Sequence, residues 1–416
     1  MIGFMAQTVH VPGLVLTEHE FQVPLDHDRP DGERITVFAR EVADPAGRDR
    51  PFLVFLQGGP GHEAARPTGA PSAPSWLGRA LQDYRVLMLD QRGTGRSTPV
   101  GTLPGRTPQQ QADYLKHFRA DAIVRDAEFV RAALGGDPWS LLGQSFGGFC
   151  TVHYLSTAPE GLREALITGG VPPVGLHPDE IYRATYVTML ERNRRYYLRY
   201  PGDRDRVRAV HERLDAGEGV LPNGTPLTSR RFRQVGNVLG MSDGAEHLHY
   251  LLERDPASPA FAYDVAAALP FSGRNPLYAV IHEASYADGF ATRWSAARVR
   301  PAEYDDDITL FSGEHMYPWT CAEDPGLAPL SEAADLLAEH EWPRLYDADR
   351  LRACEVPCAA AIYAEDAYVD RALSEETARL LPRMRTWVTN EYEHNGLRAN
   401  GGHVLDRLIA LARGRA

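Results

Sequence analysis

Short runs of consecutive apolar residues alternate along this chain with longer stretches in which apolar residues recur every three or four positions. Such runs are typical of strands buried on both faces of a sheet, and such stretches are typical of the helices that cover it. We predict strands at 52–57, 85–90, 139–142, 165–168, 359–364 and 385–389, and an additional hairpin within 18–43. The fold class that this alternation predicts is α/β, with a mostly parallel central sheet covered on both faces.

The pattern changes in the middle of the chain. Strand-like runs disappear there, and Tyr, Arg, Pro and Glu dominate in helical segments such as 179–200 and 245–253. A chain of 416 residues also exceeds one ordinary core, so an insertion or a second domain is expected. We predict three segments, namely a first part of the core at 1–171, an inserted helical domain at 172–346 and a second part of the core at 347–416.

A serine lies at the junction between the third predicted strand and the helical stretch that follows it. Residues 143–147 are Gly-Gln-Ser-Phe-Gly, so glycines stand two positions before and after Ser145. Glycine is required where the strand and helix backbones approach too closely for side chains, and such a turn forces its apex into a sparsely populated conformation. We expect the hydroxyl of Ser145 to be exposed above the sheet as a nucleophile.

A glycine-rich segment, Gln-Gly-Gly-Pro-Gly at 57–61, follows the first predicted parallel strand. Ligand sites in open α/β sheets lie at the carboxyl ends of strands, where backbone N–H groups can stabilise a developing negative charge. We expect an oxyanion hole formed by one N–H group from Gly58 or Gly59 and one from Phe146. A phosphate-binding loop is disfavoured because no Gly-Lys-Ser/Thr sequence follows.

Residues 90–97, Asp-Gln-Arg-Gly-Thr-Gly-Arg-Ser, follow the next strand. We expect a structural role for this segment rather than direct chemistry. A buried Arg92, paired with Asp90 or with backbone carbonyl groups, would brace the oxyanion loop.

A carboxylate stands at the end of the fifth predicted strand. Asp366 follows the strand at 359–364, where a carboxylate can orient a histidine. We choose Asp366 for this role, with Glu365 and Asp370 as alternatives.

A histidine stands just past the last predicted strand. His394 lies in the loop that follows 385–389, so the chain order is Ser, Asp, His. His403 is the alternative base, but it falls within or at the start of a predicted terminal helix at 397–413.

Charge, apolar content and cysteines indicate which partners and which cellular compartment to expect. The net charge is −12, from 44 basic and 56 acidic residues, and no basic run is interleaved with aromatic residues, so nucleic acid is not an expected partner. The N-terminus has no basic region before an apolar stretch, and no segment approaches the roughly 20 apolar residues of a membrane span. We therefore expect a cytoplasmic protein with no membrane partner. The cysteines, which we expect to be free thiols, are Cys150, Cys321, Cys354 and Cys358.

Taken together, these motifs resemble the proline iminopeptidases (prolyl aminopeptidases), serine peptidases of the α/β-hydrolase superfamily, and the length is similar to that of their longer bacterial subgroup. The resemblance rests on residues 58–61, 90–97, 143–148 and 393–398, which occur in both halves of the predicted core. The sequence departs from many relatives at Gln57, where they carry His. The oxyanion donors are backbone groups, so this departure should leave the oxyanion hole intact.

The resemblance implies a helical cap over the active site, with glutamates that bind the free N-terminus of the substrate. Glu283 and Glu314 match these positions. A charged amine close to the scissile bond is recognised by carboxylates in a partly dry pocket through charge-assisted hydrogen bonds. Aromatic residues expected to wall a small pocket for the pyrrolidine ring are Tyr286, Trp294, Tyr317 and Trp319.

The function that the resemblance implies is a serine exopeptidase acting on peptides with a free N-terminal proline. Ser145, His394 and Asp366 would form an acyl-enzyme and hydrolyse it, and no metal or organic cofactor is needed. The alternative is a small-molecule ester, lactone or amide hydrolase on the same scaffold, because the fold and the triad do not determine the substrate. Epoxide hydrolases and dehalogenases resemble this fold but use Asp at the position of Ser145, which disfavours both.

Overall fold

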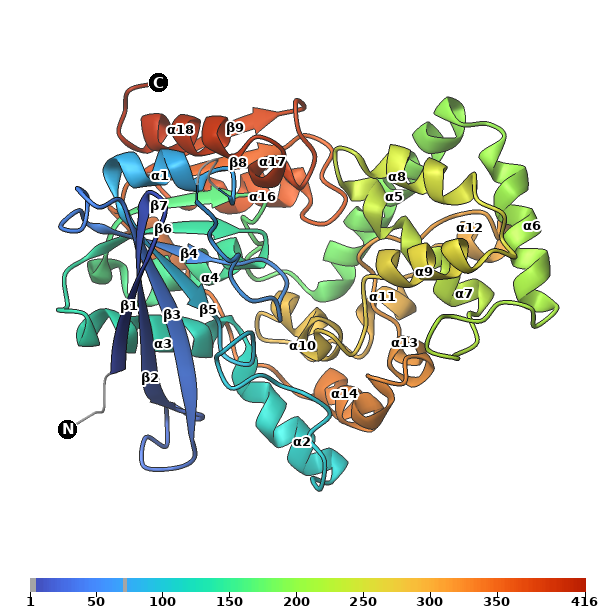
Figure 1. Ribbon diagram of the computed structural model, residues 1–416, viewed down its shortest axis with the longest axis horizontal. Helices are drawn as coiled ribbons and strands as arrows, with labels where there is room; N and C mark the ends of the chain where they lie inside the picture. The colour runs from blue at the N-terminus through green and yellow to red at the C-terminus, as the bar shows by residue number, and fades with distance from the viewer. Residues whose placement is uncertain (1–4, 70–72) are drawn as a thin grey trace.

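The computed structural model describes residues 5–69 and 73–416, which centre on one nine-stranded sheet (Figure 1). The strands are β1 (Met5–Val11), β2 (Leu14–Pro24), β3 (Arg34–Ala43), β4 (Phe52–Leu56), β5 (Arg85–Asp90), β6 (Trp139–Gln144), β7 (Leu162–Thr168), β8 (Cys358–Tyr363) and β9 (Met384–Thr389). Their order in the sheet is β1-β2-β3-β5-β4-β6-β7-β8-β9. Pairing is antiparallel from β1 to β5 and parallel from there to β9, which confirms the predicted fold class.

Helices cover both faces of the sheet, and this explains the apolar runs of central strands such as β4 and β8. Outside the insertion, the helices are α1 (Leu77–Asp83), α2 (Pro108–Leu115), α3 (Ala120–Ala133), α4 (Phe146–Thr157), α15 (Ala348–Arg352), α16 (Arg371–Ala378), α17 (Gly396–Ala399) and α18 (Gly401–Ala412). Val54 and Leu56 of β4 share a core with α3 and α4, whereas Leu53 and Phe55 share a core with α1 and α18. Successive side chains point to opposite faces, so each strand contributes to both cores.

The chain between β7 and α15 forms the helical part on the right of Figure 1. Its α-helices are α5 (Pro178–Arg199), α6 (Asp203–Asp215), α7 (Ser229–Phe232), α8 (Gly244–Leu252), α9 (Pro259–Ala268), α10 (Pro276–Val280), α11 (Ser295–Arg298), α12 (Glu303–Asp306), α13 (Pro318–Glu323) and α14 (Ser331–Glu339). Short 3-10 helices are η1 (Lys116–Phe118), η2 (Pro159–Gly161), η3 (Arg233–Gly240), η4 (Glu283–Tyr286) and η5 (Ala328–Leu330). Of the helices in residues 5–69 and 73–416, none is both long and apolar enough to cross a bilayer.

Two different cores hold this helical part in place. Residues of α6, α8 and α9, such as Val207 and Phe261, form an apolar cluster of their own with the outer end of α5. Residues of α10 and α14, such as Leu277 and Leu337, belong instead to the core that includes α3 and α4. Helix α14 also packs against α2. The second part of the insertion is therefore continuous with the core of the sheet.

The predicted terminal helix at 397–413 is interrupted. Asn400, with φ −149° and ψ 61°, separates α17 from α18. The interruption brings Gly401 against the start of α1, where a Cβ atom would lie 2.8 Å from both the backbone nitrogen and the Cβ of Trp76. A continuous helix could not make this approach, so tertiary packing overrides the helical pattern.

Candidate active site

Ser145 lies at the sharp turn between β6 and α4. Its backbone has φ 53° and ψ −123°, a conformation that residues other than glycine rarely adopt. The turn requires glycine at position 147, where a Cβ atom would lie 1.8 Å from the carbonyl oxygen of Leu56. The strand, the turn and the helix that the sequence predicts are all present, and Ser145 stands at the carboxyl edge of the parallel strands.

The structure brings Ser145, His394 and Asp366 together at this edge. The hydroxyl of Ser145 donates a hydrogen bond to Nε2 of His394 over 2.8 Å, and Nδ1 of His394 donates one to Oδ2 of Asp366 over 2.8 Å. All three side chains are buried. A carboxylate only accepts, so Asp366 places the imidazole proton on Nδ1 and leaves Nε2 to accept from the serine.

The alternative residues for these positions are engaged elsewhere. Glu365 forms an ion pair with Arg195, and Asp370 caps the N-terminus of α16. His403 is exposed on α18 and contacts the ring of Trp387. The structure therefore does not bring any of them to Ser145.

The environment of His394 favours its protonated form. Burial disfavours the imidazolium and lowers the pKa of His394, but the charge and the hydrogen bond of Asp366, with a further contribution from the charge of Glu314, outweigh burial. The pKa of His394 is therefore raised above its ordinary value. Oδ1 of Asp366 accepts the N–H groups of Tyr368 at 2.9 Å and Val369 at 3.1 Å, so this carboxylate is held on both sides.

The glycine-rich loop after β4 lies beside Ser145, as expected from the topology. A Cβ atom on Gly58 would lie 3.0 Å from the Cβ of Ser145, and Gly58 and Gly59 line the same cavity as the serine. Phe146 is the first residue of α4. The residues expected to form the oxyanion hole therefore lie beside Ser145. The carbonyl of Gln57 accepts a hydrogen bond from the side chain of Gln91 over 3.0 Å, which ties the loop to the segment after β5.

Of the two pairings expected for a buried Arg92, the structure shows the one with backbone carbonyl groups, and the one with Asp90 is wrong. The guanidinium of Arg92 binds both oxygens of Asp126 on α3, at 2.7 and 2.6 Å. It also donates to the backbone carbonyl groups of Pro24, Leu25 and His117. The expected role of Arg92 in bracing the oxyanion loop is replaced by a buried link between α3, η1 and the end of β2.

Asp90 instead supports the chain just beyond the glycine-rich loop at 57–61. Its carboxylate binds the guanidinium of Arg66 at 2.8 and 2.7 Å and accepts the N–H groups of Ala64 at 3.1 Å and Arg96 at 3.0 Å. These four bonds saturate a carboxylate that is fully buried, which leaves no acceptor for Arg92.

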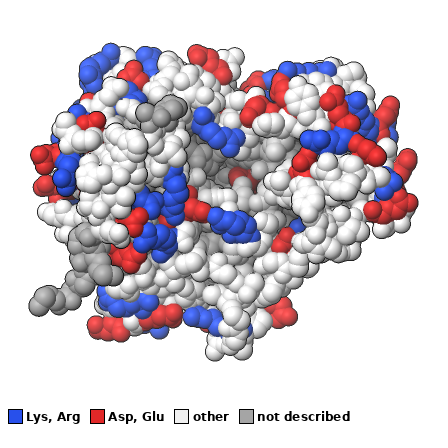
Figure 2. Space-filling view, viewed as in Figure 1, with Lys and Arg blue, Asp and Glu red and all other residues white. Residues whose placement is uncertain are grey.

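A cavity of about 430 Å³, here called the Ser145 cavity, opens onto Ser145 and His394. Figure 2 shows the molecule hollowed between its two parts, with basic side chains at the rim of the hollow and an acidic one in its depth. Apolar lining comes from Phe55, Trp76, Met241, Tyr278 and Leu397. Among the lining residues that the structure describes, only Glu314 and Arg398 carry carboxylate or guanidinium groups.

The structure places Glu314 and Glu283 in different surroundings. Glu314 lines the Ser145 cavity and accepts a hydrogen bond from the hydroxyl of Tyr278. Glu283 is not among the described residues lining that cavity. Its carboxylate accepts the N–H groups of Ser295 at 3.0 Å and Ala296 at 2.8 Å, at the start of α11. Burial raises the pKa of Glu283 to about 7, although these N–H groups act in the opposite direction.

The expected aromatic wall is formed by other residues. Those predicted, Tyr286, Trp294, Tyr317 and Trp319, are not among the described residues that line the Ser145 cavity. The ring of Trp294 donates to Asp335 over 2.9 Å, and Tyr317 and Trp319 stack on each other. The aromatic residues that do line it are Phe55, Trp76 and Tyr278. None of these stands in a recognisable motif, so the sequence carries no signal for them.

Cys150 lies one helical turn beyond the active-site turn and is completely buried in α4. It packs in the core shared by α3 and α4, and burial raises the pKa of its thiol. The other cysteines are also buried free thiols. A packing role for Cys150 therefore agrees with its surroundings.

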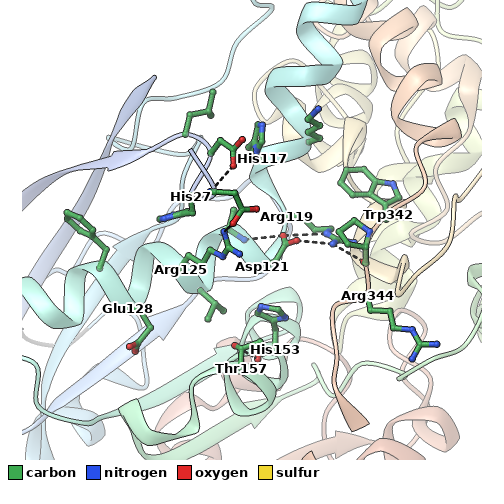
Figure 3. Close-up of a pocket in the computed structure, with 18 of the residues that line it drawn as sticks. His27, His117, Arg119, Asp121, Arg125, Glu128, His153, Thr157, Trp342 and Arg344 are labelled. Atoms are coloured by element: carbon green, nitrogen blue, oxygen red, sulfur yellow. Dashed lines mark hydrogen bonds and ion pairs between the residues drawn. The ribbon is translucent and has the colours of Figure 1, made fainter. Parts of the chain in front are cut away.

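A larger cavity, of about 1050 Å³, is lined by α3, the end of α4 and residues 340–344 (Figure 3). Its charged side chains are mostly paired, as in Arg119–Asp121, Arg125–Asp28 and His27–Asp126. Within the described lining, no side-chain hydroxyl is hydrogen-bonded to a histidine ring.

Comparison with known proteins places this arrangement in context. Residues 51–397 match the family described as the alpha/beta hydrolase fold. The chain is 47% identical to a proline iminopeptidase of Aeromonas sobria, over 98% of this chain and 100% of that protein. It is 35% identical to a proline iminopeptidase of Aspergillus aculeatus, over 97% of this chain and 95% of the relative. A solved hydrolase from a Rhodococcus strain, which acts on 2-hydroxy-6-oxo-6-phenylhexa-2,4-dienoate, covers 98% of this chain and 100% of its own with a TM-score of 0.45 at 13% identity.

Proposed function

This chain belongs to the proline iminopeptidases of the α/β-hydrolase family, and we propose that it releases proline from peptides whose N-terminal amine is free. The observation that carries the proposal is the hydrogen-bonded series from Ser145 through His394 to Asp366 beside a cavity that contains the carboxylate of Glu314. The series supplies the acyl-transfer chemistry, and the carboxylate supplies recognition of a cation.

The proposed reaction proceeds through an acyl-enzyme. Ser145 attacks the carbonyl carbon of the N-terminal prolyl residue while Nε2 of His394 accepts the serine proton. The imidazolium then gives this proton to the leaving amine as the C–N bond breaks, which leaves proline esterified to Ser145. A water molecule, deprotonated by His394, hydrolyses the ester. Asp366 keeps the imidazole oriented and stabilises its protonated form in both steps.

The negative charge of the tetrahedral intermediate is stabilised by backbone N–H groups. We assign this role to Gly58 or Gly59 together with Phe146, because these residues lie next to Ser145 on two rigid elements, the loop after β4 and the first turn of α4. Such donors, fixed before the reaction, need no reorganisation when the charge develops.

Recognition of the substrate amine is assigned to Glu314. Its carboxylate faces the Ser145 cavity and contributes to the electrostatic environment of His394. Glu283 lies outside the described lining of this cavity and its carboxylate accepts backbone N–H groups, so we propose only a longer-range electrostatic contribution from it. After burial, the charges of Glu283 and Glu314 both raise the pKa of the buried hydroxyl of Tyr182. Residues 172–346, which carry both glutamates, act in this proposal as the cap of the site.

A panel of aminoacyl-naphthylamides assayed beside p-nitrophenyl acetate tests the proposal. We expect the prolyl compound to be cleaved with the highest kcat/KM and its N-acetylated form to be cleaved far more slowly. Equal cleavage of the free and acetylated prolyl compounds would instead support a small-molecule ester, lactone or amide hydrolase.

A further inference from the structure

The Ser145 cavity contains two fixed charges of opposite sign on its two walls. Glu314 belongs to the helical insertion, and Arg398 belongs to α17 in the second part of the core. The remaining described lining is apolar or uncharged, apart from His62 and His394. Burial lowers the pKa of His62, which keeps this ring neutral near pH 7. The charges of the cavity therefore match a ligand that is itself a zwitterion.

Arg398 has no carboxylate partner within residues 5–69 and 73–416. The nearby basic side chains of the helical insertion are paired, Arg192 with Glu393 and Arg195 with Glu365. The guanidinium of Arg398 is exposed at the cavity, yet its charge reaches His394, on which it acts to lower the pKa. A guanidinium in this position is available to bind a carboxylate in a bidentate manner.

The leaving group of the proposed reaction departs into the cavity that Arg398 also lines. His394 gives its proton to the leaving amine, so that nitrogen must come within hydrogen-bonding distance of Nε2. Arg398 follows His394 by four residues, across one turn of chain in which the Arg398 N–H donates to the carbonyl of Asn395 over 2.8 Å. In a dipeptide the carboxylate is bonded to the Cα next to the leaving nitrogen. A dipeptide spans at most about 7 Å, which is short enough for both of its ends to lie in one small cavity.

We propose that Arg398 binds the C-terminal carboxylate of short substrates and makes the enzyme selective for prolyl dipeptides with a free carboxylate. This inference rests on the proposed function. Glu314 binds the amine of such a substrate and Arg398 its carboxylate, with the scissile bond at Ser145 between them. Longer peptides lose the second contact because their carboxylate lies farther from the scissile bond.

The experiment compares kcat/KM for Pro-Leu and Pro-Leu-amide in the wild type, in Arg398→Gln and in Arg398→Lys. The amide removes the carboxylate charge from the substrate, and the substitution removes the partner charge from the enzyme, so the two changes form a double-change cycle. We expect Arg398→Gln to lower kcat/KM for Pro-Leu about 5- to 30-fold more than for the amide, as for a charge-assisted bond at a partly exposed site. Arg398→Lys, which keeps the charge, should retain part of this difference.

Arg407→Gln serves as the matched control, because Arg407 is an exposed arginine on α18 that lines none of the cavities described above. It should leave the ratio of the two substrates at the wild-type value. The ratio also cancels any general effect of Arg398 on the pKa of His394, since this affects both substrates equally. An equal loss on Pro-Leu and its amide in Arg398→Gln would overturn the inference and leave the proposed function standing. Failure of the wild type to cleave any prolyl substrate would overturn both.

Discussion

The hydroxyl of Tyr278 donates a hydrogen bond to the carboxylate of Glu314 at the wall of the Ser145 cavity. Tyr278 belongs to α10, and α10 packs with α14 against the core of the sheet. This packing places Tyr278 at the wall of the cavity. The bond directs one oxygen of Glu314, and in the proposed recognition the other oxygen receives the substrate amine. It also links the proposed recognition of the amine to the part of the insertion that is continuous with the core.

Glu314→Gln should lower kcat/KM on a prolyl amide about 10- to 1000-fold, because loss of a half-buried charge partner leaves the substrate ammonium uncompensated. Tyr278→Phe should lower it about 3- to 30-fold, mainly through KM, because the carboxylate remains but is no longer directed. Activity on p-nitrophenyl acetate provides the control, since this ester has no amine. Parallel losses on the ester in both variants would contradict the assignment.

Ser145→Ala and His394→Ala should each lower kcat by about 10⁴-fold or more, because nucleophile and base act as one unit. His403→Ala should retain near-normal activity, since His403 lies exposed on α18. Circular dichroism of each variant checks that the fold is kept. An inactive His403→Ala beside an active His394→Ala would show that the base has been misassigned.

The pH dependence should reflect the raised pKa of His394. The base must be neutral to accept the serine proton, so kcat/KM on p-nitrophenyl acetate should fall as the pH decreases through a value above 6.5. The charge of Glu314 contributes to raising this pKa, so Glu314→Gln should move the acidic limb to lower pH. A limb at the same pH in both enzymes would indicate that the two groups are not coupled.

Glu283 should make stability depend on pH. Its pKa is raised from 4.5 to about 7 in the folded protein, so the folded state holds a proton that the unfolded state has released over this interval. The free energy of unfolding should therefore fall as the pH rises from about 4.5 to 7, by up to about 3 kcal/mol. Thermal unfolding of the wild type and of Glu283→Gln across this pH range measures this fall in the free energy of unfolding. The part of the fall that is due to Glu283 should be absent in the variant. A difference between the two proteins that does not change with pH would refute this.

Cys150→Ser should retain most of the activity and lose stability, by about 1–3 kcal/mol, because a hydroxyl replaces a thiol in a fully buried apolar position. Turnover and thermal unfolding of the same preparation separate the two effects. Complete loss of activity with the fold preserved would show that Cys150 does more than pack.

The positions of Ser145, Asp366 and His394 at the ends of strands follow from local pattern. Each lies at or soon after the end of a predicted strand, and the carboxyl ends of parallel strands meet at one edge of a sheet. Glycine at 147 is likewise a local requirement, because the turn at Ser145 leaves no room for a Cβ atom there. The fold class and most strand positions could therefore be predicted without knowledge of any contact between distant segments, but β1 was not predicted and β2 begins before the expected hairpin at 18–43.

The partners of the charged residues and the lining of the cavity depend on contacts between distant segments. Arg92 and Asp90 are two residues apart but bind different partners, Asp126 and Arg66, because each partner is brought in by another element. Glu283 and Glu314 were both expected to bind the substrate amine, yet Glu283 accepts an N–H group at the start of α11 and Glu314 lines the Ser145 cavity. The lining residues Trp76, Tyr278 and Arg398 come from three separate parts of the chain. Hydrophobic periodicity indicates which face of a helix or strand is buried. Which residues contact that face depends on how all the helices and strands pack together.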